Sequence, residues 1–193
     1  MLLLLSNGIQ TAQGKSALKK VIKDDGLQGK RILLFLGPYR YPSLMQRLYD
    51  ACIYLGFSSE NIVFWTEDSL IGDAPAFDYV YVTDGNCFRI LRELKKYHLI
   101  NLIRDMVKHG TCYIGASAGA VIAGGDIAIA KLFDDYSNED LSDLSALALF
   151  DGTVSPHCSK KHAKIYQKEA EVNYRNIYNI SEGKGIRIKS RWD

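Results

Sequence analysis

The chain has 193 residues, 47% of them hydrophobic and 24% charged, and a net charge of +2 at pH 7. This balance excludes a disordered or fibrous protein and is typical of one globular domain that is large enough to bury a core. Basic residues concentrate towards the C-terminus, but they are not interleaved with aromatic residues and no nucleic-acid-binding motif accompanies them, so no nucleic-acid partner is expected.

Short apolar runs recur along the chain, and each is typical of a buried parallel strand. The first, Leu2 to Leu5, is too short for a membrane span or a signal peptide and is followed by the turn-like Ser6-Asn7-Gly8. The later runs are Ile32 to Leu36, Ile62 to Trp65, Tyr79 to Val82 and Cys112 to Ile114.

Between these runs, apolar residues repeat with the period of a helix. One repeat is flanked by Pro42 and Gly56, and another ends before Gly110. Their apolar faces are Leu44, Leu48, Ala51 and Leu55, and Leu99, Leu102, Ile103, Met106 and Val107. The alternation predicts an α/β fold with three layers, in which helices cover both faces of a doubly wound, mostly parallel sheet. No repeat or linker interrupts it, so residues 1–193 are expected to form a single domain.

The cysteines indicate a reducing compartment. Cys52, Cys87, Cys112 and Cys158 stand far apart and form no CxxC pair, so neither a metal site nor a disulfide framework is expected. We therefore expect a cytoplasmic protein. On separate grounds, no cofactor and no membrane association are expected.

The most informative motif is Gly115-Ala-Ser117-Ala-Gly119, which follows an apolar run. It predicts a nucleophile elbow, a tight turn between strand and helix from which the serine hydroxyl projects above the sheet edge. The backbone N–H of Ala118 would then begin a helix and be available to a developing oxyanion. A serine whose small neighbours merely allow close packing of helix and strand is the alternative.

A serine nucleophile needs a base, and His157 has the most suitable context among the four histidines. It follows Thr153-Val-Ser-Pro156, a short strand-like run that would bring the imidazole to the carboxyl edge of the sheet. The others, His98, His109 and His162, fall in or at the end of helical patterns.

The third group should be a carboxylate that fixes the imidazole tautomer. Asp134 and Asp135 lie between Ser117 and His157, in a polar stretch that predicts an exposed loop leaning over the site. The residue pattern does not show which of these two aspartates is the third group. For each of them, the alternative to a catalytic role is that of an ordinary acidic residue in a loop.

With these residues in place, the chain resembles the peptidase E (aspartyl dipeptidase) and cyanophycinase family of serine peptidases almost from end to end. Tyr79 to Phe88 resembles that family's strand and its Gly-Gly-Asn-Thr-Phe turn. Gly115 to Ala120 resembles its Gly-x-Ser-Ala-Gly-Ala elbow, and Ser155-Pro-His157 resembles its Asn-Pro-His. Leu2 to Asn7 resembles its first strand.

The resemblance implies a flavodoxin-like or class I glutamine-amidotransferase-like sheet, with Ser117 as nucleophile and His157 as base. It also implies an oxyanion hole made by the N–H groups of Gly85 and Ala118, and a substrate-binding role for Asn86. The turn after the apolar strand agrees, because Gly85 there is free to adopt a positive φ. The family's spacing before the histidine favours Asp135 over Asp134 as the third member.

The chain departs from the family's pattern in three ways. Asp84 replaces the first glycine of the turn and Cys87 its threonine, which changes the charge beside the oxyanion hole. The arginine with which peptidase E reads the substrate's aspartate has no clear counterpart, so aspartyl specificity is not expected; Lys160, Lys161 or Lys164 would supply a substitute positive charge. The C-terminus is short relative to the family.

These features predict a serine peptidase, monomer or homodimer, that hydrolyses a short peptide or a related amide through a Ser-His-Asp triad and an acyl-enzyme. Two alternatives stay open. An α/β-hydrolase esterase shares the GxSxG motif and the Ser, Asp, His order, although only 40 positions separate Ser117 from His157. The second alternative is a non-catalytic flavodoxin-like scaffold that binds a small ligand or partner. The altered turn and the missing arginine favour this alternative.

Overall fold

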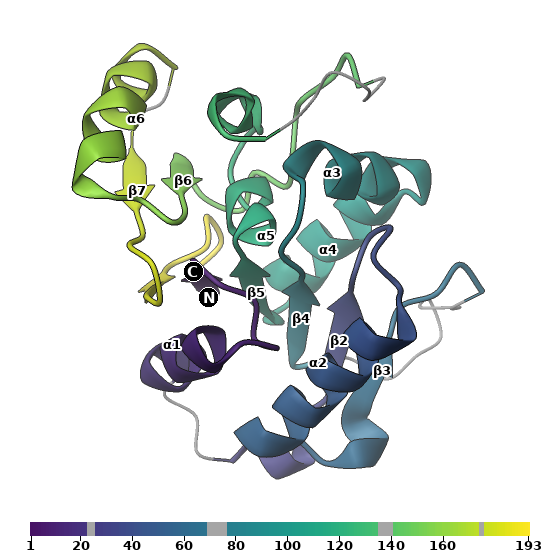
Figure 1. Cartoon of the computed structure of the whole chain (residues 1–193). Helices are drawn as coiled ribbons and strands as arrows, with labels where there is room; N and C mark the ends of the chain where they lie inside the picture. Colours follow the sequence, from purple (N-terminus) through teal and green to yellow (C-terminus); the bar gives the residue numbers. More distant parts are fainter. Residues whose placement is uncertain (23–25, 69–76, 135–140, 174–175) are drawn as a thin grey trace.

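A six-stranded sheet lies between helices on both of its sides (Figure 1). The structure is a computed structural model that describes residues 1–22, 26–68, 77–134, 141–173 and 176–193. The strand order is β3-β2-β4-β5-β1-β8, and all neighbours are parallel except β1 and β8, which are antiparallel. The strands are β1 (Leu2–Leu5), β2 (Ile32–Phe35), β3 (Ile62–Phe64), β4 (Tyr79–Val82), β5 (Cys112–Ala116) and β8 (Gly185–Ile188).

The continuous apolar runs form strands because both faces of the sheet are covered. In β1, Leu3 and Leu5 pack into the core beneath α1 and α2, whereas Leu2 and Leu4 pack into the core beneath α3, α4 and α5. All four leucines are 0% exposed. These helices are α1 (Ala12–Ile22), α2 (Pro42–Leu55), α3 (Cys87–Lys96), α4 (Leu99–Lys108) and α5 (Ala118–Ile122). The predicted three-layer α/β fold is therefore confirmed.

The helix ends follow local chemistry. Pro42 begins α2, where the missing N–H costs no hydrogen bond. Gly56 ends α2 with a φ of 114°, and its N–H donates to the carbonyls of Cys52 and Ile53. At the start of α1, Oγ1 of Thr11 accepts a hydrogen bond from the N–H of Gly14 at 3.0 Å.

A smaller parallel sheet stands apart from the main one. It pairs β6 (Thr153–Ser155) with β7 (Ile177–Asn179), and α6 (Lys160–Asn173) lies between them in the sequence and beside them in space (Figure 1). Short 3₁₀ helices are Leu27–Gly29, Ser59–Asn61 and Ala128–Leu132. Among the helices in the described ranges, none is both long and apolar enough to cross a bilayer.

Candidate active site

Ser117 occupies a strained turn between β5 and α5, with φ 47° and ψ −105°. The glycines on either side of Ser117 are required because neighbouring backbone atoms leave no room for a side chain there. A Cβ at Gly115 would lie 2.5 Å from the carbonyl oxygen of Gly119, and a Cβ at Gly119 would lie 2.2 Å from that of Val82. The GxSxG spacing therefore lets helix and strand approach closely enough to hold the serine in an elbow.

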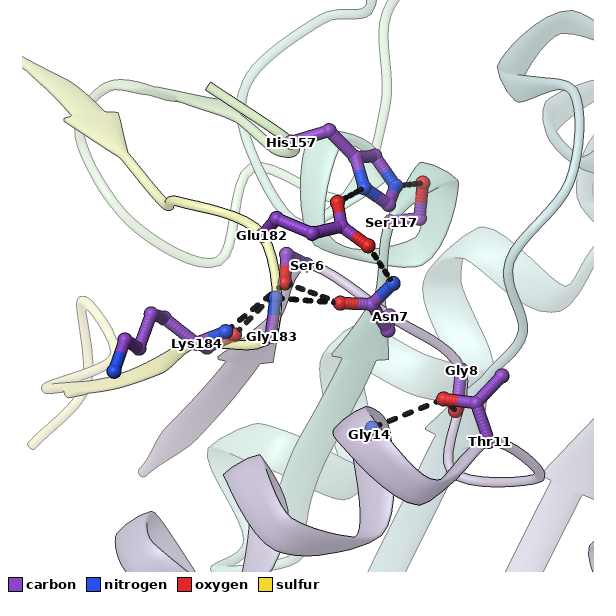
Figure 2. A network of polar contacts seen from close by, with 10 residues as sticks. All are labelled: Ser6, Asn7, Gly8, Thr11, Gly14, Ser117, His157, Glu182, Gly183 and Lys184. Atoms are coloured by element: carbon purple, nitrogen blue, oxygen red, sulfur yellow. Dashed lines mark hydrogen bonds and ion pairs between the residues drawn. The ribbon is translucent and has the colours of Figure 1, made fainter. Parts of the chain in front are cut away.

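His157 reaches Ser117 from the end of the smaller sheet. It follows β6 and Pro156, and a φ of 53° turns its ring towards the elbow. Oγ of Ser117 lies 3.0 Å from Nε2 of His157 (Figure 2). The structure thus brings together the two residues that the sequence analysis singled out as nucleophile and base.

A carboxylate contacts the other ring nitrogen of His157. Oε2 of Glu182 lies 2.5 Å from Nδ1 of His157, and Figure 2 shows the two side chains and Ser117 in one line of contacts. Hydrogen bonds from His157 and then from Asn7 lower the pKa of Glu182 below its usual range, so this carboxyl is ionised. An ionised acceptor at Nδ1 holds the proton there and leaves Nε2 free to accept a proton from Ser117.

Glu182 is held in place by the end of β1. Nδ2 of Asn7 donates to Oε1 of Glu182 at 2.6 Å, and Oδ1 of Asn7 accepts from the N–H of Gly183 at 2.8 Å. Beside it, the N–H of Ser6 donates to the carbonyl of Lys184 at 2.9 Å, and the N–H of Lys184 donates to Oγ of Ser6 at 3.2 Å. The loop between β7 and β8 is therefore tied to the first strand, as Figure 2 shows.

The two predicted acids do not occupy this place in the described structure. Asp134 accepts a hydrogen bond at Oδ2 from the N–H of Cys87 at 2.7 Å, and Asp135 lies outside the described residues. The acid at His157 is Glu182, which follows the histidine in the sequence. Glu182 was not predicted from the sequence, because the acids considered there lie between Ser117 and His157. The available signal was an acid in the glycine-containing turn Ser181-Glu-Gly-Lys-Gly185, directly after the strand-like Ile177-Tyr-Asn-Ile180.

Two backbone donors lie close to the serine. Gly85 has a φ of 136°, and a Cβ there would lie 2.4 Å from the ring of Tyr39. Ala118 is the first residue of α5. Within the described ranges, the N–H groups of Gly85 and Ala118 donate no hydrogen bond. Both donors are therefore available to a ligand.

The departures from the family turn are accommodated locally. The carboxylate of Asp84 accepts two hydrogen bonds from Nε2 of Gln10, at 2.9 and 3.0 Å, and one from Oγ1 of Thr83 at 3.0 Å. Thr83 belongs to the same turn and Gln10 to the segment after β1, and these neutral donors satisfy acceptors of the Asp84 carboxylate. Burial, followed by the nearby Asp134, raises the pKa of Cys87 well above its usual range. That thiol stays protonated and is not a competing nucleophile.

The predicted substrate-binding residues have different positions. Oδ1 of Asn86 accepts hydrogen bonds from the N–H groups of Phe88 and Arg89 at 3.0 and 3.1 Å, so Asn86 caps α3. Lys160 is the first residue of α6, and its side chain is outside the part of the structure that is described.

A cavity of about 380 Å³ opens beside the serine. Two aromatic side chains, Phe133 and Tyr166, line the cavity. Their rings pack edge to face with centroids 6.0 Å apart. In the described ranges, no cluster of His, Cys, Asp or Glu is arranged to hold a metal ion. The lining residues are Gly85, Cys87, Ser117, Phe133, Asp134, Pro156, His157 and Tyr166.

The sequence of this chain is similar to those of known peptidases. The sequence profile of "Peptidase family S51" matches residues 2–191. The chain is 35% identical to the uncharacterized peptidase Lmo0363 of Listeria monocytogenes over 59% of this chain and 58% of that protein. It is 34% identical to peptidase E of Shewanella putrefaciens over 63% of this chain and 52% of that protein. The matches thus span little more than half the length of these curated relatives.

A solved structure supports the same relationship. The crystal structure of a candidate peptidase E from Listeria monocytogenes EGD-e superposes on this chain with a TM-score of 0.75 at 27% identity. The superposition covers 100% of this chain and 95% of that one. The likeness therefore extends over the whole fold, including the elements that carry Ser117, His157 and Glu182.

Proposed function

The chain belongs to peptidase family S51, and from this membership we propose that it is a serine peptidase that hydrolyses a short peptide through an acyl-enzyme. Ser117 is the nucleophile, His157 the general base and Glu182 the third member of the triad. The observation that carries the proposal is the unbroken line of contacts from Oγ of Ser117 through His157 to Glu182, at 3.0 and 2.5 Å, beside a cavity.

Acylation begins when Oγ of Ser117 attacks the carbonyl carbon of the scissile amide. The hydroxyl proton passes to Nε2 of His157, and the ionised Glu182 stabilises the resulting imidazolium through Nδ1. The N–H groups of Gly85 and Ala118 donate hydrogen bonds to the carbonyl oxygen and stabilise the negative charge that develops on it. As the C–N bond breaks, His157 returns the proton to the leaving amine, which departs as the first product.

Deacylation repeats the sequence with water. His157 takes a proton from a water molecule while the oxygen of that water attacks the acyl carbon. The bond between the acyl carbon and Oγ of Ser117 then breaks. The proton returns to Oγ, which restores the free enzyme, and the acyl group leaves as a carboxylic acid. Both steps use only side chains and backbone groups of this chain together with water.

The test is labelling with a fluorophosphonate probe combined with hydrolysis of a dipeptide panel. We expect the wild type to react at Ser117 and to release free amino acids, and Ser117→Ala to do neither. Ser59→Ala, an exposed serine in the 3₁₀ helix Ser59–Asn61, is the matched control and should behave as the wild type. Full hydrolysis by Ser117→Ala would refute the proposal, and so would a wild type that the probe does not label.

A further inference from the structure

The cavity beside Ser117 contains a carboxylate for which the proposed mechanism has no use. We propose that Asp134, with the rings of Phe133 and Tyr166, forms a subsite that binds a cationic ammonium group on the acyl-side residue of the substrate. The inference rests on the proposed function, because it assigns the acyl side of the substrate to this cavity. The three side chains line the same cavity as Ser117 and His157.

Hydrogen bonds of its backbone and of its side chain position Asp134 at the wall of the cavity. Its backbone N–H donates to the carbonyl of Ala130 at 2.7 Å, and its Oδ2 accepts the N–H of Cys87 at 2.7 Å. The Cys87 thiol also contacts this carboxylate, but among the described residues Asp134 forms no ion pair. The contacts from Cys87 are neutral, so the negative charge of Asp134 has no cationic partner in the described part of the chain and would attract a cationic ligand.

The aromatic pair adds to this attraction. Phe133 directly precedes Asp134, and Tyr166 comes from α6. Their rings meet at an interplanar angle of 85°, and Phe133 is 38% exposed whereas Tyr166 is 8% exposed. Aromatic faces attract ammonium groups through their quadrupole, and the attraction is stronger where water is partly excluded. A carboxylate beside two aromatic rings is thus suited to a cation rather than to an anion.

The ammonium nearest to the reaction is the substrate's own N-terminus. In a dipeptide, one carbon atom separates the α-ammonium from the carbonyl that Ser117 attacks. A cavity of about 380 Å³ is at the small end of the range for ligand pockets, roughly 300–1,000 Å³, which suits a substrate of one or two residues. A lysine side chain on the acyl-side residue is the other possible source of the ammonium.

The same charge disfavours acidic substrates. An aspartate side chain that entered the cavity would bring a second carboxylate close to Asp134, and like charges at short range repel. The subsite therefore fits the absence of a clear counterpart to the aspartate-reading arginine in the sequence.

Asp134→Asn is the appropriate variant, because asparagine keeps the volume and the acceptor for the N–H of Cys87 but removes the charge. The substrates are Leu-Ala, N-acetyl-Leu-Ala and N-acetyl-Lys-Ala. We expect Asp134→Asn to lower kcat/KM for Leu-Ala by about 10- to 100-fold through KM, the range for loss of a charge-assisted hydrogen bond. Hydrolysis of N-acetyl-Leu-Ala should change less than about twofold. Asp50→Asn, an exposed acid on α2, is the matched control.

The substrates separate the two sources of the cation. A loss confined to N-acetyl-Lys-Ala would keep the subsite and assign it to a substrate side chain. An equal loss on all three substrates, or no loss on any, would overturn the proposal.

A binding measurement tests the ammonium subsite without relying on catalysis. In calorimetric titrations, Ser117→Ala should bind leucinamide and should bind N-acetyl-leucinamide at least about tenfold more weakly. The double variant Ser117→Ala, Asp134→Asn should lose that preference. If the preference is absent from Ser117→Ala, the ammonium subsite is wrong even where the wild type is an active peptidase. If the preference is present but the wild type hydrolyses nothing, the proposed function fails and the subsite stands.

Discussion

Oε2 of Glu182 lies 2.5 Å from Nδ1 of His157, and the glutamate follows the histidine by 25 positions in the sequence. The chain order is therefore Ser117, His157, Glu182. In an α/β-hydrolase the acid precedes the histidine. This order, together with the placement of Glu182 in a loop beside β8, favours a peptidase of family S51 over the esterase alternative.

The carboxylate of Glu182 is expected to be needed for turnover. Glu182→Gln should lower kcat by about 10² to 10⁴, because an amide neither stabilises the imidazolium nor holds the correct tautomer of His157. The measurement is steady-state hydrolysis of a dipeptide, with Glu171→Gln on the exposed part of α6 as the matched control. Activity within about threefold of the wild type would remove Glu182 from the triad.

The same residue should contribute to the pH dependence of folding. Hydrogen bonds from His157 and Asn7 lower the pKa of Glu182 in the folded chain, so its ionised form favours folding. This contribution is present above the usual glutamate pKa of about 4.3 and is lost as the pH falls through the lowered value. Urea titrations should therefore show that the difference in unfolding free energy between wild type and Glu182→Gln shrinks from about pH 7 to about pH 3. A difference independent of pH would contradict the linkage.

Asn7 is expected to act as a positioning residue. Asn7→Ala removes the donor to Oε1 of Glu182 and the acceptor for the N–H of Gly183. We expect kcat to fall by about 10- to 100-fold with little change in KM, because the loss of a hydrogen bond to a charged group costs about 1.5–3 kcal/mol. Asn61→Ala, whose amide contacts the carbonyl of Gln28 far from the site, is the control. A rise in KM without a fall in kcat would indicate substrate contact instead.

Gly85 offers a test of the oxyanion hole. Gly85→Ala places a methyl group 2.4 Å from the ring of Tyr39 and strains a residue whose φ is 136°, so its N–H should shift. We expect kcat to fall by about 10² to 10³. Gly110→Ala is the matched control, since Gly110 has a φ of 103° and no atom within 4 Å of the added Cβ. Both variants should lose roughly 1–3 kcal/mol of stability from backbone strain, and only Gly85→Ala should lose turnover. Equal kinetics for the two would exclude a role for Gly85.

Local patterns were sufficient for most of the fold. Continuous apolar runs such as Leu2 to Leu5 predict strands buried on both faces, because parallel sheets are covered by helices. Pro42 and Gly56 predict the ends of α2, because each residue has a backbone preference that needs no distant partner. The small residues of Gly115 to Gly119 predict a tight turn for the same reason. These features depend on neighbours in the sequence, so the sequence alone determines them.

Side-chain roles near the site depended on tertiary contacts. Asn86, predicted to bind substrate, caps α3 through its side-chain oxygen. Asp134, predicted as a candidate third member, contacts the N–H of Cys87 and faces the cavity. Glu182 meets His157 because β8 pairs with β1 and Asn7 then fixes the loop beside it. The strands, the helices and the elbow thus follow from local sequence patterns, whereas the identity of the carboxylate that contacts the imidazole follows from long-range contacts. Pairing of β1 with β8, which come from opposite ends of the sequence, brings that carboxylate into place, and no local backbone preference does so.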